Sequence, residues 1–295
     1  MGFVFQEVEQ VVKTQCQIVN SLIEMLDTLI IGLDFSVDKE KRKTFAVCLR
    51  DKELDRVVDT KTSNLDNQSL SCRLLELTKN WEEIILAIDS PMGWPANMSR
   101  DLKNHIAGTK LQNEPRESRQ NYFRRTTDKF IQRALSQTPL SIGADKIASM
   151  AFDALEIMDN INWKFQLDVG YGIESNYKVI EVYPSATIAD RLKNKPKISG
   201  KKSDYGVRER IFNSIIEVPG STISKDFLSG FDVLSSDHLF DAFLCLMTGI
   251  DYVKEKLYRP IEVNNITNMT MNEEIIRKEG WIWALRKETG YNKNA

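Results

Sequence analysis

The amino-acid sequence predicts an α/β fold in which helices cover both faces of a β-sheet. Two apolar runs, 29–35 and 83–89, read as buried strands, and they lead to Asp34 and Asp89. The elements in this part of the chain follow the order strand, strand, strand, helix, strand. Strands that are apolar along their whole length are typical of a sheet that is buried on both faces.

The first expected element is an amphipathic helix over residues 3–27, which we treat as a segment, 1–28, ahead of the main domain. Its apolar residues recur in alternating steps of four and three, starting with Val4, Val8 and Val11, and Gln15 interrupts them. This stripe of about three heptads favours one of two arrangements. The helix packs either on its own domain or in a homodimer through residues 3–27.

The main domain is expected to span residues 29–295. It begins with predicted strands and one helix, at 29–35, 44–49, 54–59, 68–80 (the helix) and 83–89. Ser90–Pro95 breaks this pattern, because proline and glycine interrupt regular structure. We interpret the polar, mostly helical stretch at about 97–165 as an insertion. The remaining elements are a strand, two helices and an apolar tail, at 178–183, 204–217, 236–257 and 280–283.

The composition excludes several classes of protein. The formal net charge is −2, so the molecule as a whole does not indicate a nucleic-acid partner. The four cysteines form no C-x-x-C pair, which argues against a structural zinc site, and the two histidines leave carboxylates as the main candidate metal ligands. We find no basic N-terminal region and no apolar run of about 18 residues. We therefore expect a cytoplasmic protein that does not span a membrane.

Carboxylates gather at the predicted carboxyl ends of strands and at the start of one helix. Ligands of α/β sheets bind outside the carboxyl ends of strands, so Asp34 and Asp89 should share a crevice if their strands are neighbours. The helix at 236–257 adds Asp237 and Asp241, which share one face, with His238 close to them. Carboxylates this close need a positive partner, and Mg²⁺ prefers oxygen ligands. The pattern predicts a Mg²⁺ or Mn²⁺ site.

Glu181 is a further candidate, because it lies in the middle of the apolar strand 178–183. Buried acids are rare unless they are paired or bound to metal. Each candidate also has a structural interpretation. A strand-end aspartate or Asp237 can cap the next segment, Glu181 can face solvent, and His238 can lie on a helix surface. The prediction rests on the joint pattern.

Five segments carry a resemblance to a known family. They are Ile31–Asp34, Ala87–Pro95, Arg125-x-x-Asp128, Val179–Pro184 and Ser236–Ala242. They resemble the family catalogued as domain of unknown function 429, whose members are regarded as predicted nucleases of the ribonuclease H-like fold. The resemblance covers roughly residues 29–257 and the segment Glu279–Ile282. The segment 237–242 also resembles the last catalytic motif of RuvC-type resolvases.

This resemblance implies a ribonuclease H-like domain with a mixed five-stranded sheet, helices on both faces, a helical insertion and an additional N-terminal helix. It implies that Asp34 bridges two metal ions and that Asp89 lies on the neighbouring strand. Asp241, with His238 or Asp237, would complete the metal site from the last helix.

The implied activity is phosphodiester hydrolysis by a two-metal mechanism. Two Mg²⁺ ions about 3.5–4 Å apart would activate a water and stabilise the leaving oxygen. His238 would instead orient or deprotonate the water if its imidazole faces the site. Glu181 matches a family segment and is expected as a catalytic residue.

Two stretches of the chain are basic and are expected to contact nucleic acid. Residues 99–133 hold nine Lys or Arg against four Asp or Glu, and residues 191–210 hold eight against two. They are either solvated faces or contacts to a phosphate backbone beside the carboxylates. We expect Arg125, with Arg124, to hold the substrate phosphate, and Asp128 to be the structural partner of Arg125.

Two other functions share this predicted core. An actin-like ATPase or phosphotransferase needs glycine-rich hairpins close to its phosphates, whereas Phe35-Ser36-Val37 follows Asp34 here. It also needs two such domains, and the sequence predicts one. The other alternative is a catalytically inactive nucleic-acid-binding module of the same fold. The retained acids favour the nuclease.

Overall fold

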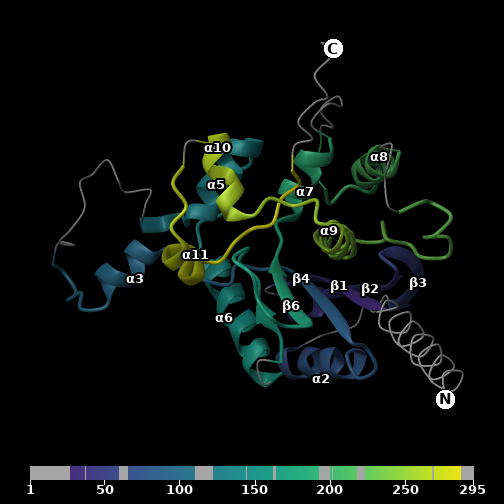
Figure 1. The fold of residues 1–295 in the computed structure, drawn as a ribbon, viewed down its shortest axis with the longest axis horizontal. Coiled ribbons are helices and arrows are strands. Elements are labelled where there is room, and N and C mark those ends of the chain that lie inside the picture. The colour runs from purple at the N-terminus through teal and green to yellow at the C-terminus, as the bar shows by residue number, and fades with distance from the viewer. Residues whose placement is uncertain are drawn as a thin grey trace, which may run out of the picture.

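A mixed six-stranded sheet forms the centre of the structure, which is a computed structural model (Figure 1). The structure describes residues 27–36, 38–59, 66–109, 122–143, 145–161, 164–192, 200, 202–217, 223–267 and 269–286. The strands are β1 Thr28–Asp34, β2 Lys43–Arg50, β3 Glu53–Asp59, β4 Glu83–Asp89, β5 Gln166–Leu167 and β6 Tyr177–Glu181. The predicted α/β class is therefore confirmed.

The strand order in the sheet is β3-β2-β1-β4-β6-β5. The pairs β1–β2 and β2–β3 are antiparallel, whereas β4, β6 and β5 continue the sheet in parallel from β1. The prediction of five strands was wrong by one. The additional strand, β5, has only two residues and runs beside β6, and so short an element carries no periodic signal.

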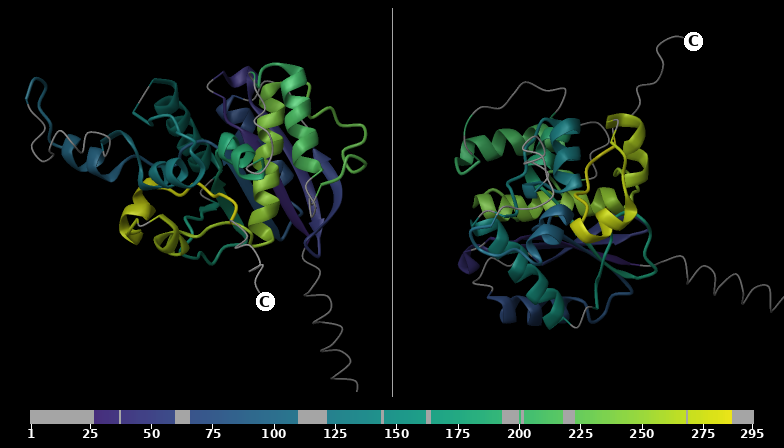
Figure 2. Two further views of the ribbon diagram at one scale, coloured as in Figure 1. Left: turned by 90° about the horizontal axis from the view of Figure 1, so that it is seen from above. Right: turned by 90° about the vertical axis from the view of Figure 1, so that its left-hand side faces the viewer.

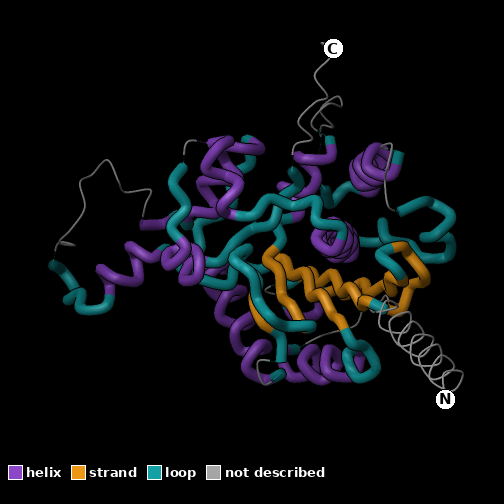
Figure 3. The backbone as a smooth tube through the Cα atoms, in the orientation of Figure 1, coloured by secondary structure: helices purple, strands orange, loops and turns teal. Residues whose placement is uncertain are grey.

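Helices cover both faces of the sheet. The helices of the described chain are α2 Asn67–Leu77, α3 Ala96–Leu102, α5 Thr126–Leu135, α6 Asp145–Asn160, α7 Pro184–Arg191, α8 Tyr205–Ile216, α9 Asp237–Val253, α10 Pro260–Thr267 and α11 Glu273–Glu279, with a 3₁₀ turn, η1, at Lys39–Lys41. Figure 2 shows α2 and α6 on one face and α9, with α8 beyond it, on the other. In Figure 3 the strands lie between these two helical layers. The stretch 97–165 thus contains α3 and α5 as well as α6, which packs beside α2.

The two faces of the sheet belong to two separate hydrophobic cores. Along β1, Ile30 packs into the core that contains α9, whereas Leu29 and Ile31 pack into the core that contains α2 and α6. Successive side chains of a strand point to opposite faces. Even-numbered residues of β1, among them Asp34, therefore face α9.

Two glycines allow α9 to lie directly on β1. A Cβ atom at Gly32 of β1 would lie 2.1 Å from the carbonyl oxygen of Ala242 in α9. A Cβ atom at Gly249 of α9 would lie 2.6 Å from the Cγ2 atom of Ile30. Real Cβ atoms do not approach other heavy atoms this closely, so only glycine permits this separation of helix and strand. The contact at Gly32 holds the first turns of α9 beside the end of β1.

Replacing Gly32 with alanine is expected to destabilise the protein by about 3 kcal/mol or more, because the methyl group must push α9 away from β1. A strand glycine that had free space beside it would show the opposite trend, since alanine restricts the unfolded chain. Urea denaturation measures the difference. Gly143→Ala is the matched control, because its Cβ would have no neighbour closer than 3.6 Å. Equal stability of the two variants would contradict the close approach.

The predicted helix at 3–27, and with it the predicted homodimer contact, lies outside the described residues apart from Asp27. Within the described residues, no helix is long and apolar enough to cross a membrane.

Candidate metal centre

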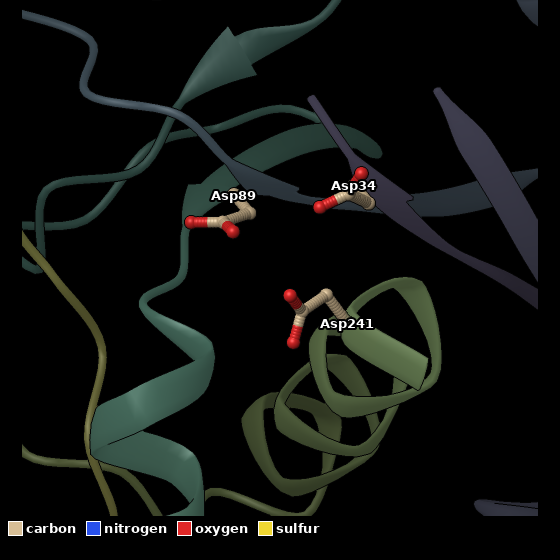
Figure 4. A group of neighbouring side chains, drawn as sticks. All are labelled: Asp34, Asp89 and Asp241. Atoms are coloured by element: carbon tan, nitrogen blue, oxygen red, sulfur yellow. The ribbon is translucent and has the colours of Figure 1, made fainter. Parts of the chain in front are cut away.

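Three aspartates from three elements meet at one end of the sheet. Asp34 ends β1, Asp89 ends β4 and Asp241 lies in the second turn of α9. One carboxylate oxygen from each lies within 4.8 Å of the other two. Figure 4 shows the three carboxylates directed toward a common space. This is the convergence that the sequence predicts.

The fold explains the convergence in simple terms. β1 and β4 are parallel neighbours, and their register pairs Asp34 with Asp89. On β4, Ile85 and Ala87 pack into the α9 core, so the alternation directs Asp89 to the same face as Asp34. The close contact at Gly32 brings Asp241 to this face. One residue of shift in the β1–β4 register would turn one of the two strand aspartates away.

His238 is held against Asp34. Its Nδ1 atom lies 2.8 Å from the Oδ2 atom of Asp34, and its side chain is 27% exposed. Ser236 caps α9 by accepting a hydrogen bond from the backbone N–H of Leu239, and this cap orients the first turn. The hydrogen bond to Asp34 raises the pKa of His238, with burial acting in the opposite direction.

Asp237, the other predicted ligand on this helix, lies apart from the three aspartates. Its side chain is 40% exposed, and its Oδ1 atom is 3.9 Å from the Nε2 atom of His238. It occupies the first helical position of α9, where a carboxylate interacts favourably with the helix dipole. The geometry therefore makes Asp34, Asp89 and Asp241, and not Asp237, the group that could hold a metal ion.

Lys202, which no pattern in the sequence distinguishes, completes the group. Its ammonium donates to both carboxylate oxygens of Asp241. Arg208 of α8, a buried residue, fixes the backbone beside it by donating from Nη1 to the carbonyl oxygens of Lys202 and Ser203, at 2.9 and 2.8 Å. The same guanidinium donates from Nε and Nη2 to the carbonyl oxygen of Leu234, just before α9, at 3.0 and 2.8 Å.

Burial makes the three aspartates difficult to ionise together. Burial raises the pKa of Asp34, while His238 lowers it. The pKa of Asp89 lies well above its ordinary value because of burial and the nearby charges of Asp241 and Asp34. Burial also raises the pKa of Asp241 to about 6, although Lys202 acts against it. Such a group of hard oxygen donors is stabilised by added positive charge, which fits a divalent cation.

Arg125 and Glu181 were predicted to act on substrate, but the structure joins them in a buried ion pair. Arg125 donates from Nη1 and Nη2 to the two carboxylate oxygens of Glu181 at 2.8 and 2.6 Å. It also donates to Asp128 at 3.0 Å and to the carbonyl oxygen of Glu279 at 3.0 Å. Both side chains are about 3% exposed. With its donors occupied, Arg125 is not placed to hold a substrate phosphate.

Sheet register explains why Glu181 is not part of the metal centre. Glu181 pairs with Ile88, one residue before Asp89, so its side chain leaves the opposite face of the sheet from Asp89. There it accepts a hydrogen bond from the backbone N–H of Met92 at 3.2 Å. Glu181 therefore supports the segment that follows β4 and does not contribute an oxygen to the metal centre.

A C-terminal segment completes this buried network. Glu279 accepts hydrogen bonds from the backbone N–H groups of Ala96, at 2.8 Å, and Thr126, at 2.5 Å. These residues begin α3 and α5, so one side chain caps two helices. Gly280 has φ +84°, and a Cβ atom there would lie 3.0 Å from the Oε2 atom of Glu181. The predicted apolar tail is thus packed beside the Arg125–Glu181 pair.

The two basic stretches contribute fewer free cations than their composition indicates. In the second stretch, Arg191 pairs with Asp251, Lys202 with Asp241, and Arg208 donates to three carbonyl oxygens. In the first, Arg125 is buried in its network. The Nη1 atom of Arg124, also predicted to hold phosphate, is buried and has no hydrogen-bond partner among the described residues. Residues 110–121, 193–199 and 201 lie outside the described chain.

Comparison with known proteins gives one match. The family model described as "Protein of unknown function (DUF429)" matches residues 32–264, well over half of the chain. The searches of curated proteins and of solved structures found no match. The match includes Asp34, Asp89, Asp241 and Lys202. The chain therefore belongs to the DUF429 family of proteins of unknown function.

Proposed function

We propose that this protein is a metal-dependent nuclease that hydrolyses phosphodiester bonds, with Mg²⁺ or Mn²⁺ bound by Asp34, Asp89 and Asp241. One observation carries the proposal: these three carboxylates, from two parallel strand ends and a helix, place oxygens within 4.8 Å of one another in a partly buried position. Such a donor set suits a hard divalent cation, because Mg²⁺ is bound in proteins through carboxylate oxygens.

We further propose that the fold is ribonuclease H-like. Support comes from the three antiparallel strands β3-β2-β1, which are followed in the sheet by the parallel strands β4 and β6. The last long helix, α9, lies across β1 and β4 and carries Asp241 with His238. The resemblance of residues 237–242 to the last motif of RuvC-type resolvases supports the same assignment.

When bound, divalent cations supply Lewis acidity and stabilise developing negative charge, and a two-metal mechanism is the form that the resemblance implies. The side chains of the site would have different roles. Asp34 and Asp89 provide one edge of the site, because they end two neighbouring strands inside the sheet. Asp241 provides the opposite edge from α9. Nucleic acid is the proposed substrate.

His238 is the candidate for proton transfer. With Asp34 ionised, its Nδ1–H donates to that carboxylate, which fixes the tautomer and the ring orientation. The side chain of His238 is 27% exposed, and its Nε2 atom lies 3.9 Å from the Oδ1 atom of Asp237. A proton can therefore be exchanged at Nε2 with a water or a leaving oxygen while Nδ1 keeps its partner.

The test is a cleavage screen with labelled single-stranded, double-stranded, hybrid and branched DNA and RNA in Mg²⁺ and in Mn²⁺. We expect at least one substrate to be cut by the wild-type protein and not by Asp34→Asn. Asp226→Asn, which removes an exposed acid, serves as the matched control and should keep full activity. Divalent-ion binding without cleavage of any substrate in the panel would reject the nuclease and leave the metal site.

A further inference from the structure

Lys202 binds carboxylate oxygens that a divalent cation at the three aspartates would also need. Its ammonium donates to both carboxylate oxygens of Asp241, and its charge also acts on Asp34 and Asp89. The side chain is 28% exposed and that of Asp241 is 13% exposed. A partly buried ammonium at this place neutralises part of the carboxylate charge.

Hydrogen bonds from Arg208 hold the backbone of Lys202 beside the site. Arg208 donates to the carbonyl oxygens of Lys202 and Ser203 on one side and of Leu234 on the other, so it ties this backbone to the segment that leads into α9. Arg208 is 5% exposed, which makes these hydrogen bonds costly to break. If the ammonium leaves Asp241, the side chain must stay at the edge of the carboxylates.

Metal binding and the Lys202–Asp241 ion pair compete for the same oxygens. Both oxygens of Asp241 accept from Lys202, and a metal ion requires at least one of them. A metal ion and an ammonium bound to the same carboxylate would repel each other, so the ammonium must leave Asp241 when the metal binds. The released ammonium then has no carboxylate partner. A negatively charged phosphate oxygen of the substrate, bound beside the metal, can accept its hydrogen bond in place of Asp241.

We propose that Lys202 is an exchangeable counter-ion that leaves Asp241 when metal binds and then binds the substrate phosphate, so that metal and phosphate bind cooperatively. This inference rests on the proposed metal site. Before binding, Lys202 balances the carboxylates. After binding, it contributes to phosphate recognition. Because coupling between two ligands is reciprocal, each ligand raises the affinity for the other by the same factor.

The test is calorimetric titration of Mn²⁺ into the wild-type protein and into Lys202→Met, at equal free Mn²⁺ concentrations, with thymidine 5′-monophosphate, with neutral thymidine or with neither. Removing the competing ammonium should make Lys202→Met bind Mn²⁺ alone about tenfold tighter than wild type, within the usual range of coupling factors. The nucleotide should raise the Mn²⁺ affinity of the wild type about tenfold and that of Lys202→Met less than twofold. Thymidine should change neither.

Two further variants serve as controls for this test. Lys202→Arg keeps the positive charge and should keep the weaker Mn²⁺ affinity, which makes the result independent of how well Lys202→Met folds. Lys254→Met removes a lysine that is 16% exposed and paired with Glu53 at the other end of α9, and it should behave as wild type.

The outcomes separate the two proposals. Lys202→Met that binds Mn²⁺ no tighter than wild type, or an equal effect of the nucleotide on both proteins, overturns the role of Lys202 and leaves the metal site intact. Absence of Mn²⁺ binding in every protein overturns the metal site and, with it, this inference.

Discussion

Replacing Asp89 with asparagine is expected to stabilise the metal-free protein by roughly 1 kcal/mol and to remove most metal binding and hydrolysis. Asp89 faces the carboxylates of Asp34 and Asp241, and no hydrogen-bond donor reaches its carboxylate within the described residues. Asparagine keeps the shape of the side chain and removes the repulsion. Catalysis is lost because a metal ligand acts mainly in the transition state.

The stabilisation should depend on pH, and its sign follows from the raised pKa values. A carboxyl whose pKa is higher in the folded state favours folding while it is protonated, and this contribution is lost as the pH rises through the folded pKa. For Asp241 the window extends from its ordinary value of 3.8 to about 6, and the pKa of Asp89 is also raised. The advantage of Asp89→Asn should therefore be small near pH 4 and should grow as the pH rises above it, because the raised pKa of Asp89 moves its ionisation in the folded protein to higher pH.

Asp34→Asn should gain less stability than Asp89→Asn. Asp34 accepts a charge-assisted hydrogen bond from His238, which asparagine weakens, whereas Asp89 has no such bond to lose. From the sequence alone, the same change in stability is expected for both variants. Urea denaturation in EDTA, together with cleavage in Mg²⁺, measures both effects. If both variants are clearly less stable than wild type and still cleave, the aspartates are structural and the nuclease proposal fails.

Breaking the buried pair between Arg125 and Glu181 should produce the largest loss of stability, roughly 3–5 kcal/mol for Glu181→Ala. The loss arises because the guanidinium stays buried with only Asp128 and a carbonyl oxygen to balance it. Glu181→Gln keeps the shape but removes the charge, so it should also be clearly destabilised. Both effects are measured by urea denaturation of the metal-free protein.

The matched control is Glu53→Gln, which removes one side of the exposed ion pair with Lys254. Its stability should change by less than about 1 kcal/mol, because exposed pairs contribute little. Binding of Mn²⁺ to Glu181→Gln, measured under conditions where it remains folded, should match wild type. A Glu181→Gln variant that is as stable as wild type but no longer binds Mn²⁺ would indicate that Glu181 is a metal ligand after all.

The sequence predicts the position of Asp34, Asp89 and Asp241 well, for a local reason. Each strand aspartate follows an apolar run long enough to define a buried strand. Asp241 lies on a helix whose apolar face can be recognised from the spacing of its apolar residues. Parallel neighbours then bring strand ends together without any detailed knowledge of packing. Which face each aspartate occupies follows from the alternation along the strands and from Gly32, whose close contact with α9 shows only in the structure.

The functions predicted for Glu181 and Arg125 could not be obtained correctly from the sequence. A mid-strand acid in an apolar run is correctly identified as buried, but its partner lies 56 residues away, and its face depends on the register with β4. Register cannot be obtained from one strand alone. Lys202 was one cation among eight in a basic stretch, and its contacts with Asp241 and Arg208, which appear only in the structure, distinguish it.

The double cap by Glu279 has a consequence for the order in which the chain acquires its structure during synthesis. The residues it caps, Ala96 and Thr126, precede it by 183 and 153 residues. At translation rates of about 5–20 residues per second, α3 and α5 leave the ribosome roughly 10–40 s before their shared cap exists. During that interval Arg125 also lacks the carbonyl oxygen of Glu279. The starts of α3 and α5, which are made well before the C-terminal segment, therefore acquire their shared cap only when the residues around 279–283 emerge and dock.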